Sequence, residues 1–155
     1  MASPEIIESL KRCELFSTIA DEDIMHIADI CSFENFNAGE TVISQGAFSS
    51  QIYLITEGQV ALIRSVNLGD RQGTATVDVL GKGRGFGWSC ILCDPCGASA
   101  SALCQKPSTL IALPGSELRG LLEKKPQLGF TVMERLAQII ANRLRAAYGA
   151  MDTLR

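Results

Sequence analysis

The sequence predicts an α+β fold that is mainly β, with an antiparallel sandwich or barrel between helical segments at the two ends. Two observations predict this class. Apolar residues recur at helical spacing before residue 32 and after residue 117. Between residues 33 and 113, turn signals recur about every ten residues and separate segments that favour strands.

Composition limits the class of protein further. The chain has 155 residues, 46% of them hydrophobic, and a net charge of −3. These values predict one domain over residues 1–155, whose core needs no disulfide or metal. They exclude a disordered chain, and the absence of a long apolar run excludes a membrane span. A pI of about 5.2 disfavours DNA as a partner. The N-terminus lacks a secretory signal, so we expect a cytoplasmic protein with reduced thiols.

The helical N-terminus, residues 1–32, contains two predicted helices. Apolar residues from Ile6 onward predict a short helix that ends near Phe16. The run Asp21-Glu22-Asp23 predicts the first turn of a second helix, because carboxylates there meet free N–H groups and the positive end of the helix dipole.

Strands and turns alternate through the predicted β-domain, residues 33–113. The turns are expected at Asn37-Ala38-Gly39-Glu40, Gln45-Gly46-Ala47, Glu57-Gly58 and Leu68–Gly73. The strands are expected around Phe33–Phe36, Val42-Ile43, Gln51–Ile55, Gln59–Arg64, Thr74–Leu80 and Leu103–Leu113. Alternating glycines from Gly81 to Gly87 predict bends, or backbone that approaches another group closely.

Residues 117–154 are predicted to form two C-terminal helices. Pro114-Gly115-Ser116-Glu117 is expected to cap a helix over Glu117–Lys124, which Pro126 ends. A long helix follows over about Leu128–Leu154. Alternating steps of four and three residues form a heptad seam on this helix: Met133, Ala137, Ile140, Leu144, Ala147, Met151 and Leu154.

The heptad seam predicts a homodimer through the last helix. A second apolar stripe, Val132, Leu136 and Ile139, is then expected to face the β-domain of its own chain. The alternative is that both stripes serve one globular core.

Catalysis is not predicted by any set of residues. The single histidine, His26, is expected on the second helix as a surface or half-buried residue. The spacings typical of serine hydrolases, zinc proteases and phosphate-binding loops do not occur. We therefore expect a protein that is not an enzyme.

Five motifs together resemble a known family. In their order and spacing, Leu15-Phe16, Asn37-Ala38-Gly39-Glu40, Gln45-Gly46, Tyr53–Val60 and Phe86-Gly87 resemble a cyclic nucleotide-binding domain, the type found in catabolite activator proteins and protein kinase A regulatory subunits. The resemblance implies an eight-stranded jelly-roll barrel over residues 33–113 and a ligand-binding cassette over residues 81–100. It also implies a cyclic nucleotide ligand and a last helix that dimerises and transmits the signal.

The cassette departs from the family pattern at both charged positions. The resemblance implies F-G-E-[IL]-A-L followed by P-R-[ST]-A, where the glutamate accepts from the ribose hydroxyl and the arginine neutralises the phosphate. Here Trp88 stands at the glutamate, and Ala98, or Gly97 if the loop shifts, stands at the arginine. We therefore expect weak or no binding of cyclic AMP and cyclic GMP. The candidate ligand-binding residues are Gly85, Phe86, Gly87, Trp88, Ser89, Cys90, Ala98, Ser99 and Ala100.

The altered cassette leaves the content of the pocket open. Trp88 can close it as part of the core. Alternatively, Trp88, Phe86, Ile91 and Leu92 form an apolar site for a small uncharged or aromatic ligand. Arg84 lies near enough in the sequence to be considered as a replacement cation.

Four of the six cysteines fall in the same region: Cys90, Cys93, Cys96 and Cys104. Three hypotheses apply to them. They are ordinary buried thiols, redox-active thiols, or ligands of a metal ion or cluster. Cys90 is the best redox candidate, because a helix N-terminus lowers a thiol pKa.

The chain ends at Arg155, directly after the predicted long helix, so we expect neither a DNA-binding helix-turn-helix domain nor another output domain. Two functions fit. The protein is a stand-alone regulatory or sensory module that acts on an unknown protein partner, with a ligand or thiol signal that shifts the last helix. Alternatively, it is a structural adaptor that uses the barrel and helix as a binding platform.

Overall fold

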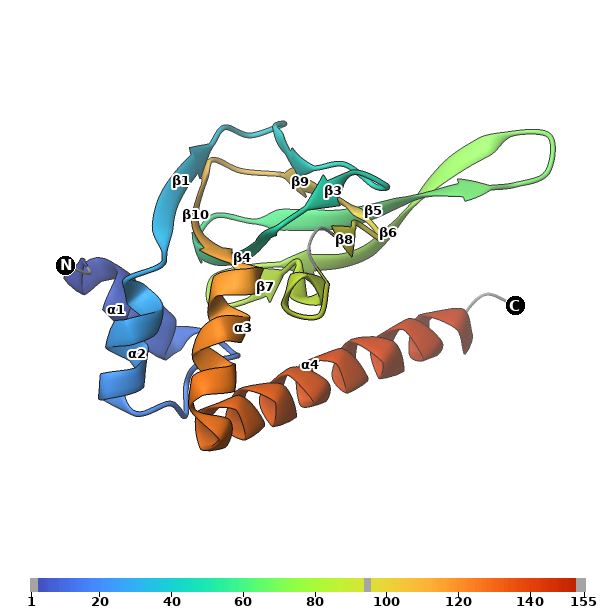
Figure 1. The fold of residues 1–155 in the computed structure, drawn as a ribbon. Helices are drawn as coiled ribbons and strands as arrows, with labels where there is room; N and C mark the ends of the chain where they lie inside the picture. The colour runs from blue at the N-terminus through green and yellow to red at the C-terminus, as the bar shows by residue number, and fades with distance from the viewer. Residues whose placement is uncertain (1–2, 94–95, 153–155) are drawn as a thin grey trace.

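The computed structural model of the protein describes residues 3–93 and 96–152 (Figure 1). Two N-terminal helices come first, α1 (Pro4–Arg12) and α2 (Asp21–Ala28). Ser3 caps α1, because its Oγ accepts a hydrogen bond from the N–H of Glu5 at 3.2 Å. Helix α1 ends at Arg12 rather than near Phe16, since the chain turns there and buries Phe16 beneath the helices.

Antiparallel strands form the body of the molecule. The strands in the described residues are β1 (Ser32–Phe36), β2 (Thr41–Ile43), β3 (Phe48–Ser49), β4 (Gln51–Glu57), β5 (Val60–Asn67), β6 (Gln72–Leu80), β7 (Gly85–Phe86), β8 (Cys96–Gly97), β9 (Ser101–Cys104) and β10 (Ser108–Pro114). Two sheets have four strands each, β1-β10-β4-β7 and β2-β9-β5-β6, and β3 pairs with β8. Each of these pairings is antiparallel. The mainly β jelly-roll class is therefore confirmed.

One predicted strand is two strands in the structure. The run Leu103–Leu113 is divided between β9 and β10, because the chain turns between Cys104 and Ser108 and moves from one sheet to the other. Ser108 stabilises this crossover, since its Oγ accepts a hydrogen bond from the N–H of Gln59 at 3.2 Å. The β5–β6 hairpin is also longer than predicted, and its tip projects away from the barrel (Figure 1).

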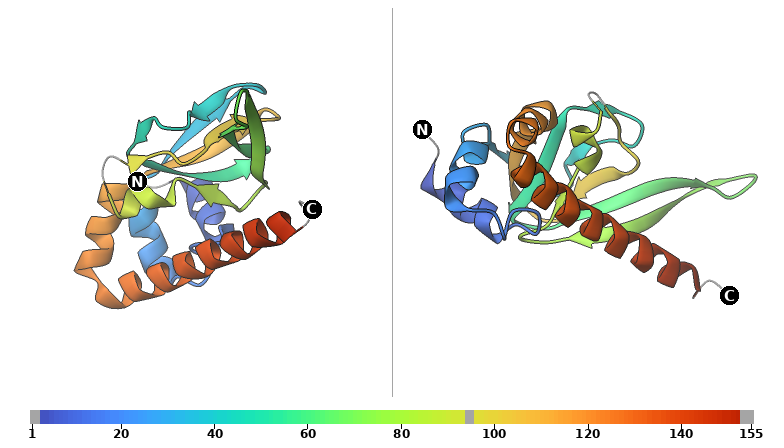
Figure 2. Two further views of the ribbon diagram at one scale, coloured as in Figure 1. Left: turned by 90° about the vertical axis from the view of Figure 1, so that its right-hand side faces the viewer. Right: turned by 60° about the horizontal axis from the view of Figure 1, so that its bottom comes forward.

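Two C-terminal helices follow the barrel, α3 (Gly115–Lys124) and α4 (Pro126–Asp152). The predicted cap of α3 is wrong, because the helix already begins at Gly115 and no side chain caps it. Pro126 separates the two helices as predicted, and it begins α4, where a missing N–H costs nothing. Figure 2 shows α4 running past the barrel in the direction of the β5–β6 hairpin.

The apolar core consists of two clusters. The larger lies among the helices and the adjoining sheet, and the smaller lies inside the barrel. Val132, Leu136 and Ile139 of α4 are buried in the larger cluster, so the stripe predicted to face inward does so. Within the described residues, no helix has the length and apolar character needed to cross a membrane.

Candidate functional site

A cavity of about 250 Å³ lies between the barrel and α4. Strands β2 to β5, β7 and β8, the 3₁₀ helix η1 (Trp88–Ile91) and α4 all contribute to its wall. Its lining residues are Ile43, Ser49, Gln51, Tyr53, Leu62, Phe86, Gly87, Trp88, Ser89, Cys90, Cys96, Ala98, Ser99, Ala100, Ile140 and Arg143. Eight of the nine candidate ligand-binding residues are in this set, and the ninth, Gly85, is not. Ile91 and Leu92 do not line the cavity, because Ile91 points into the core and Leu92 is exposed.

Glycines position the start of the cassette. Phe86 and Gly85 pair with β4, where the Phe86 ring stacks on Tyr53 at a centroid distance of 5.4 Å. Gly87 has φ of 84°, the left-handed conformation that glycine adopts without strain. A Cβ on Gly85 would lie 2.8 Å from Cη2 of Trp88. The alternating glycines therefore serve both predicted purposes, a bend at Gly87 and a close approach at Gly85.

A further glycine fixes η1 against α3. A Cβ on Gly115, the first residue of α3, would overlap the carbonyl group of Cys90 in η1. Any other residue at this position would push the two elements apart. The cassette and the C-terminal helices therefore meet in direct backbone contact.

Trp88 belongs to the core and to the cavity at once. Its side chain is 6% exposed, packs in the larger core cluster, and lines the cavity. The Nε1 atom is buried and has no hydrogen-bond acceptor within the described residues. At the position where the family resemblance implies an accepting carboxylate, this chain therefore has a bulky donor.

The segment 98–100 brings no charged side chain to the cavity. Gly97 pairs with Phe48 in the β3–β8 ribbon and does not line the cavity, so of the two residues predicted for the arginine position only Ala98 lines it. Arg64 donates a hydrogen bond to the carbonyl of Ser99, but its side chain is exposed and does not line the cavity. Both charged groups that the family pattern implies are therefore absent from the cassette.

Among the described residues that line the cavity, Arg143 of α4 is the one cation. Its Nη2 donates to the carbonyl of Gly85 at 2.6 Å and lies 3.9 Å from Oε2 of Glu14. Its Nε is buried without a hydrogen-bond partner in the described part of the chain. Burial lowers the pKa of Arg143, and the carboxylate of Glu14 opposes that shift.

From the sequence, Arg84 was considered as a cation of the ligand site and Arg143 was not. Arg84 lies outside the cavity, with Nη2 3.1 Å from Asp78 and Nε 3.6 Å from the same Glu14 oxygen. A signal for Arg143 exists in the sequence. It follows Ile139 by four residues and so continues the buried stripe, where a charged residue is unexpected.

The four clustered cysteines do not converge. Cys93 and Cys96 are joined in a disulfide, with Cα atoms 5.5 Å apart, within the range that a disulfide requires. The disulfide contradicts the expectation of reduced thiols. That expectation came from the predicted cellular compartment and not from the distance between the two cysteines. Cys90 is buried, its Sγ donates to the carbonyl of Ser49 at 3.4 Å, and Cys104 lies in the separate barrel cluster. Within residues 3–93 and 96–152, no three His, Cys, Asp or Glu side chains are placed to hold a metal ion, so the four thiols are not brought together as a ligand set.

Most of the predicted dimer seam is exposed. Ala137, Ile140, Leu144 and Ala147 lie on the open face of α4, where Ile140 is 47% and Leu144 is 49% exposed. Met133 is half-buried and packs on the larger core cluster. The side chain of Met151 and all of Leu154 are outside the described residues.

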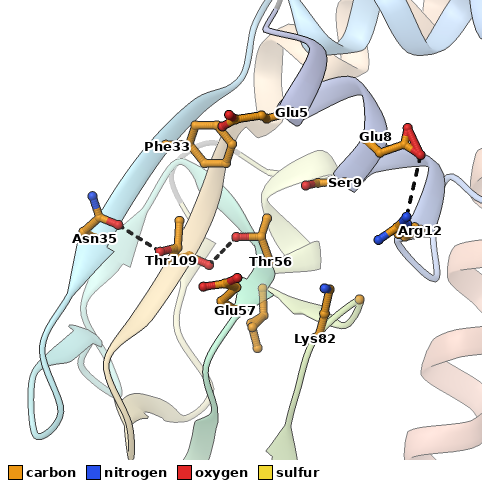
Figure 3. Close-up of a pocket in the computed structure, with 12 residues that line it drawn as sticks. Glu5, Glu8, Ser9, Arg12, Phe33, Asn35, Thr56, Glu57, Lys82 and Thr109 are labelled. Carbon is orange, nitrogen blue, oxygen red and sulfur yellow. Dashed lines mark hydrogen bonds and ion pairs between the residues drawn. The ribbon is translucent and has the colours of Figure 1, made fainter.

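A second hollow, of about 430 Å³, lies between α1 and the β1-β10-β4 face (Figure 3). Thr109 links its polar groups, because its Oγ1 donates to Oδ1 of Asn35 and its carbonyl accepts from Oγ1 of Thr56, each at 2.9 Å. The hollow shares no lining residue with the smaller cavity and none with α4, and it meets the segment 81–100 only at Lys82 and Gly83. We therefore place the candidate site at the smaller cavity.

Comparisons with known proteins identify the relatives of this chain. The family model described as "Cyclic nucleotide-binding domain" matches residues 33–125. The cyclic AMP receptor protein of Thermus thermophilus is 30% identical over 145 residues, which are 94% of this chain and 63% of that protein. This chain therefore spans less than two thirds of the length of that relative.

Solved structures give the same result. The catabolite activator protein of Thermus thermophilus aligns with a TM-score of 0.73 and 29% identity, over 91% of this chain and 62% of that one. A cyclic nucleotide-binding domain from Methylobacillus flagellatus KT aligns with a TM-score of 0.79 and 26% identity, over 97% of this chain and 84% of that one.

Proposed function

The chain belongs to the cyclic nucleotide-binding domain family, and we propose that it is a regulatory sensor module that does not bind cyclic AMP or cyclic GMP tightly. The observation that supports the proposal is the composition of the cavity wall. Trp88 and Ala98 stand where the family pattern has a carboxylate and a guanidinium. Each charge-assisted hydrogen bond contributes about 1.5–3 kcal/mol, so the loss of both weakens binding by roughly a thousandfold.

Calorimetric titration with cyclic AMP and with cyclic GMP tests this proposal. We expect no saturable heat with either ligand at concentrations where members with the full cassette are saturated. Micromolar binding of either nucleotide to the unmodified chain overturns the proposal.

A designed double variant provides the positive arm of the test. Trp88→Glu with Ala98→Arg restores both charges and is expected to raise the affinity for cyclic AMP. The matched control, Trp88→Glu with Ala98→Met, adds similar bulk at position 98 without the cation, so its affinity is expected to stay low.

The sensor is proposed to act as a homodimer through α4 and to signal to a protein partner. The exposed apolar residues Ile140 and Leu144 follow the heptad spacing, and Ile140 also lines the cavity. One residue therefore belongs to both the cavity wall and the dimer face. Sedimentation velocity is expected to give a dimer, and a monomer at all concentrations contradicts this part of the proposal.

A thiol switch is a second candidate signal, which the Cys93–Cys96 disulfide supports. Cys96 lines the cavity, and Cys93 lies two residues after η1, so opening the bond is expected to change the cavity wall. Dithiothreitol transfers two electrons and two protons to the disulfide and becomes its own cyclic disulfide, leaving two thiols.

The fluorescence of Trp88, the single tryptophan, reports this reaction. The emission is expected to change on reduction, and a variant with Cys93→Ser and Cys96→Ser is expected not to respond. If the emission changes with neither reductant nor any ligand, the result favours the structural adaptor.

A further inference from the structure

Two buried donors at the cavity lack acceptors. Trp88, which is more than nine-tenths buried, has no partner for Nε1, and Arg143 has none for Nε, within the described residues. Buried donors in folded proteins are nearly always paired. These two come from η1 and α4, which are far apart in the sequence, and both residues line the same cavity. An acceptor bound in the cavity beside these two side chains would offer the donors a partner.

The charge of the cavity wall specifies the sign of the occupant. Among the residues that the structure describes, Arg143 is the one ionised side chain in the lining, and none of the described lining residues is Asp or Glu. Its counter-charge, Glu14, lies 3.9 Å from Nη2 and outside the lining. Arg84 lies 3.6 Å from the same carboxylate but closer to Asp78, at 3.1 Å, so both carboxylates that face these two cations lie outside the lining. The ionised group that faces the cavity in the described residues is therefore the guanidinium of Arg143, and an anion is its complementary ligand.

The rest of the wall specifies the size and polarity of the occupant. The wall includes the apolar side chains of Ile43, Leu62 and Phe86. The cavity volume of about 250 Å³ has room for a small ligand with an apolar part. A single guanidinium with one additional N–H matches a planar monoanion, since a carboxylate accepts from both donors with two oxygens.

We propose that this cavity binds a small organic carboxylate, with Arg143 as its counter-ion and the indole N–H of Trp88 as a second donor. The inference rests on the proposed function, because it takes the cavity as the ligand site of the sensor. In place of a nucleotide bound by charged cassette residues, the ligand is a small acid whose charge is paired with a residue of α4. Arg143 also donates a hydrogen bond to the carbonyl of Gly85 in β7, so the same side chain would contact both the ligand and β7.

Nuclear magnetic resonance tests the inference at the site itself. The chain has one tryptophan, so its spectrum contains a single indole N–H signal. The probes are benzoate, phenylacetate and 4-methylpentanoate, with benzyl alcohol as the uncharged match for benzoate and inorganic phosphate as an anion without an apolar body. We expect at least one carboxylate to shift the indole N–H signal in a saturable way. Benzyl alcohol and phosphate are expected to bind at least tenfold more weakly.

Three variants separate the proposed contacts from general damage. Arg143→Gln is expected to weaken carboxylate binding at least tenfold and to leave benzyl alcohol unaffected, while Arg143→Lys keeps part of the affinity. Arg145→Gln is the matched control, because Arg145 is an exposed residue of the same helix that does not line the cavity, and it is expected to bind the carboxylate as the parent does. Circular dichroism checks that each variant is folded.

The outcomes distinguish this inference from the function on which it rests. If no carboxylate binds, or if Arg143→Gln binds carboxylate as well as the parent, the inference is overturned. If cyclic AMP binds at micromolar concentration, the proposed function is overturned, whatever the carboxylates do. Failure of all the probes, nucleotides included, overturns only the inference.

Discussion

The two halves of α4 have similar apolar spacing but different surroundings. In the first half, Leu128–Ile139, the inward residues are buried against the N-terminal helices and α3. In the second half, Ile140–Gly149, the large apolar side chains are about half exposed. The change occurs where Ile140 and Arg143 line the cavity. A repeating pattern therefore specifies the face of a helix, whereas the position of the barrel decides which part of that face is covered.

The largest expected effect is on stability, in the first half of the helix. Leu136→Ala removes a fully packed side chain and leaves a cavity, so the free energy of unfolding is expected to fall by about 2–5 kcal/mol. Urea unfolding followed by circular dichroism measures it. Leu144→Ala is the matched control in the second half and is expected to cost less than about 1 kcal/mol in the monomer. Equal losses would remove the distinction between the two halves.

An effect on assembly is expected next, in the second half. Leu144→Asp places a charge on the proposed seam, so the dimer is expected to dissociate about ten to a hundred times more readily. Sedimentation equilibrium measures the constant. Ala146→Asp introduces the same charge on an exposed residue outside the seam and is expected to change it little. If the two variants behave alike, the seam is not the contact.

The smallest expected effect of a single residue is the pH dependence that each of two thiols beside the first half gives to stability. Burial raises the pKa of Cys13 and of Cys31 to about 12 from 9.0, and both pack in the cluster that covers this half. Above pH 9 the unfolded thiols ionise while the folded ones stay protonated, so stability is complete below pH 9 and falls toward pH 12. We expect each thiol to remove about 1.4 kcal/mol between about pH 8 and about pH 10.

Variants assign that pH dependence. Urea unfolding of Cys31→Ala is measured at about pH 8 and about pH 10. Its free energy of unfolding is expected to fall less than that of the parent between these pH values, by the contribution of one thiol. The variant with Cys93→Ser and Cys96→Ser is expected to show the same loss as the parent, because these two cysteines form a disulfide and have no thiol proton to release. If the free energy of unfolding of the parent is the same at both pH values, the predicted pH dependence is wrong.

Much of the fold follows from local pattern. Helix α2 begins at Asp21 and Pro126 separates α3 from α4, because charge at a helix start and the missing N–H of proline act over a single turn. Strands β3 and β8 were not predicted. Each of these strands has only two residues, which is too short to show a periodic pattern. They form because the fold brings Phe48 beside Gly97.

The candidate site was predictable on one side only. The cassette residues from Phe86 to Cys90 are adjacent in the sequence, so their grouping follows from the motif alone. Arg143 comes from a helix that begins far along the chain, and the turn of α4 that meets the barrel depends on tertiary packing. The Cys93–Cys96 pairing was also missed, since an argument from cellular compartment says nothing about how close two thiols lie.

The backbone contact between Gly115 and Cys90 has a mechanical consequence. Lys125 alone separates α3 from α4, so the long helix is mounted almost directly on the element that touches the cassette. Its 27 residues span about 40 Å at 1.5 Å per residue. A rotation of about 5° at Pro126 would then carry the far end through roughly 3.5 Å, close to the width of a methyl group. With this geometry, a displacement of the cassette that is too small to open the barrel would move the end of α4 several times further than the cassette itself.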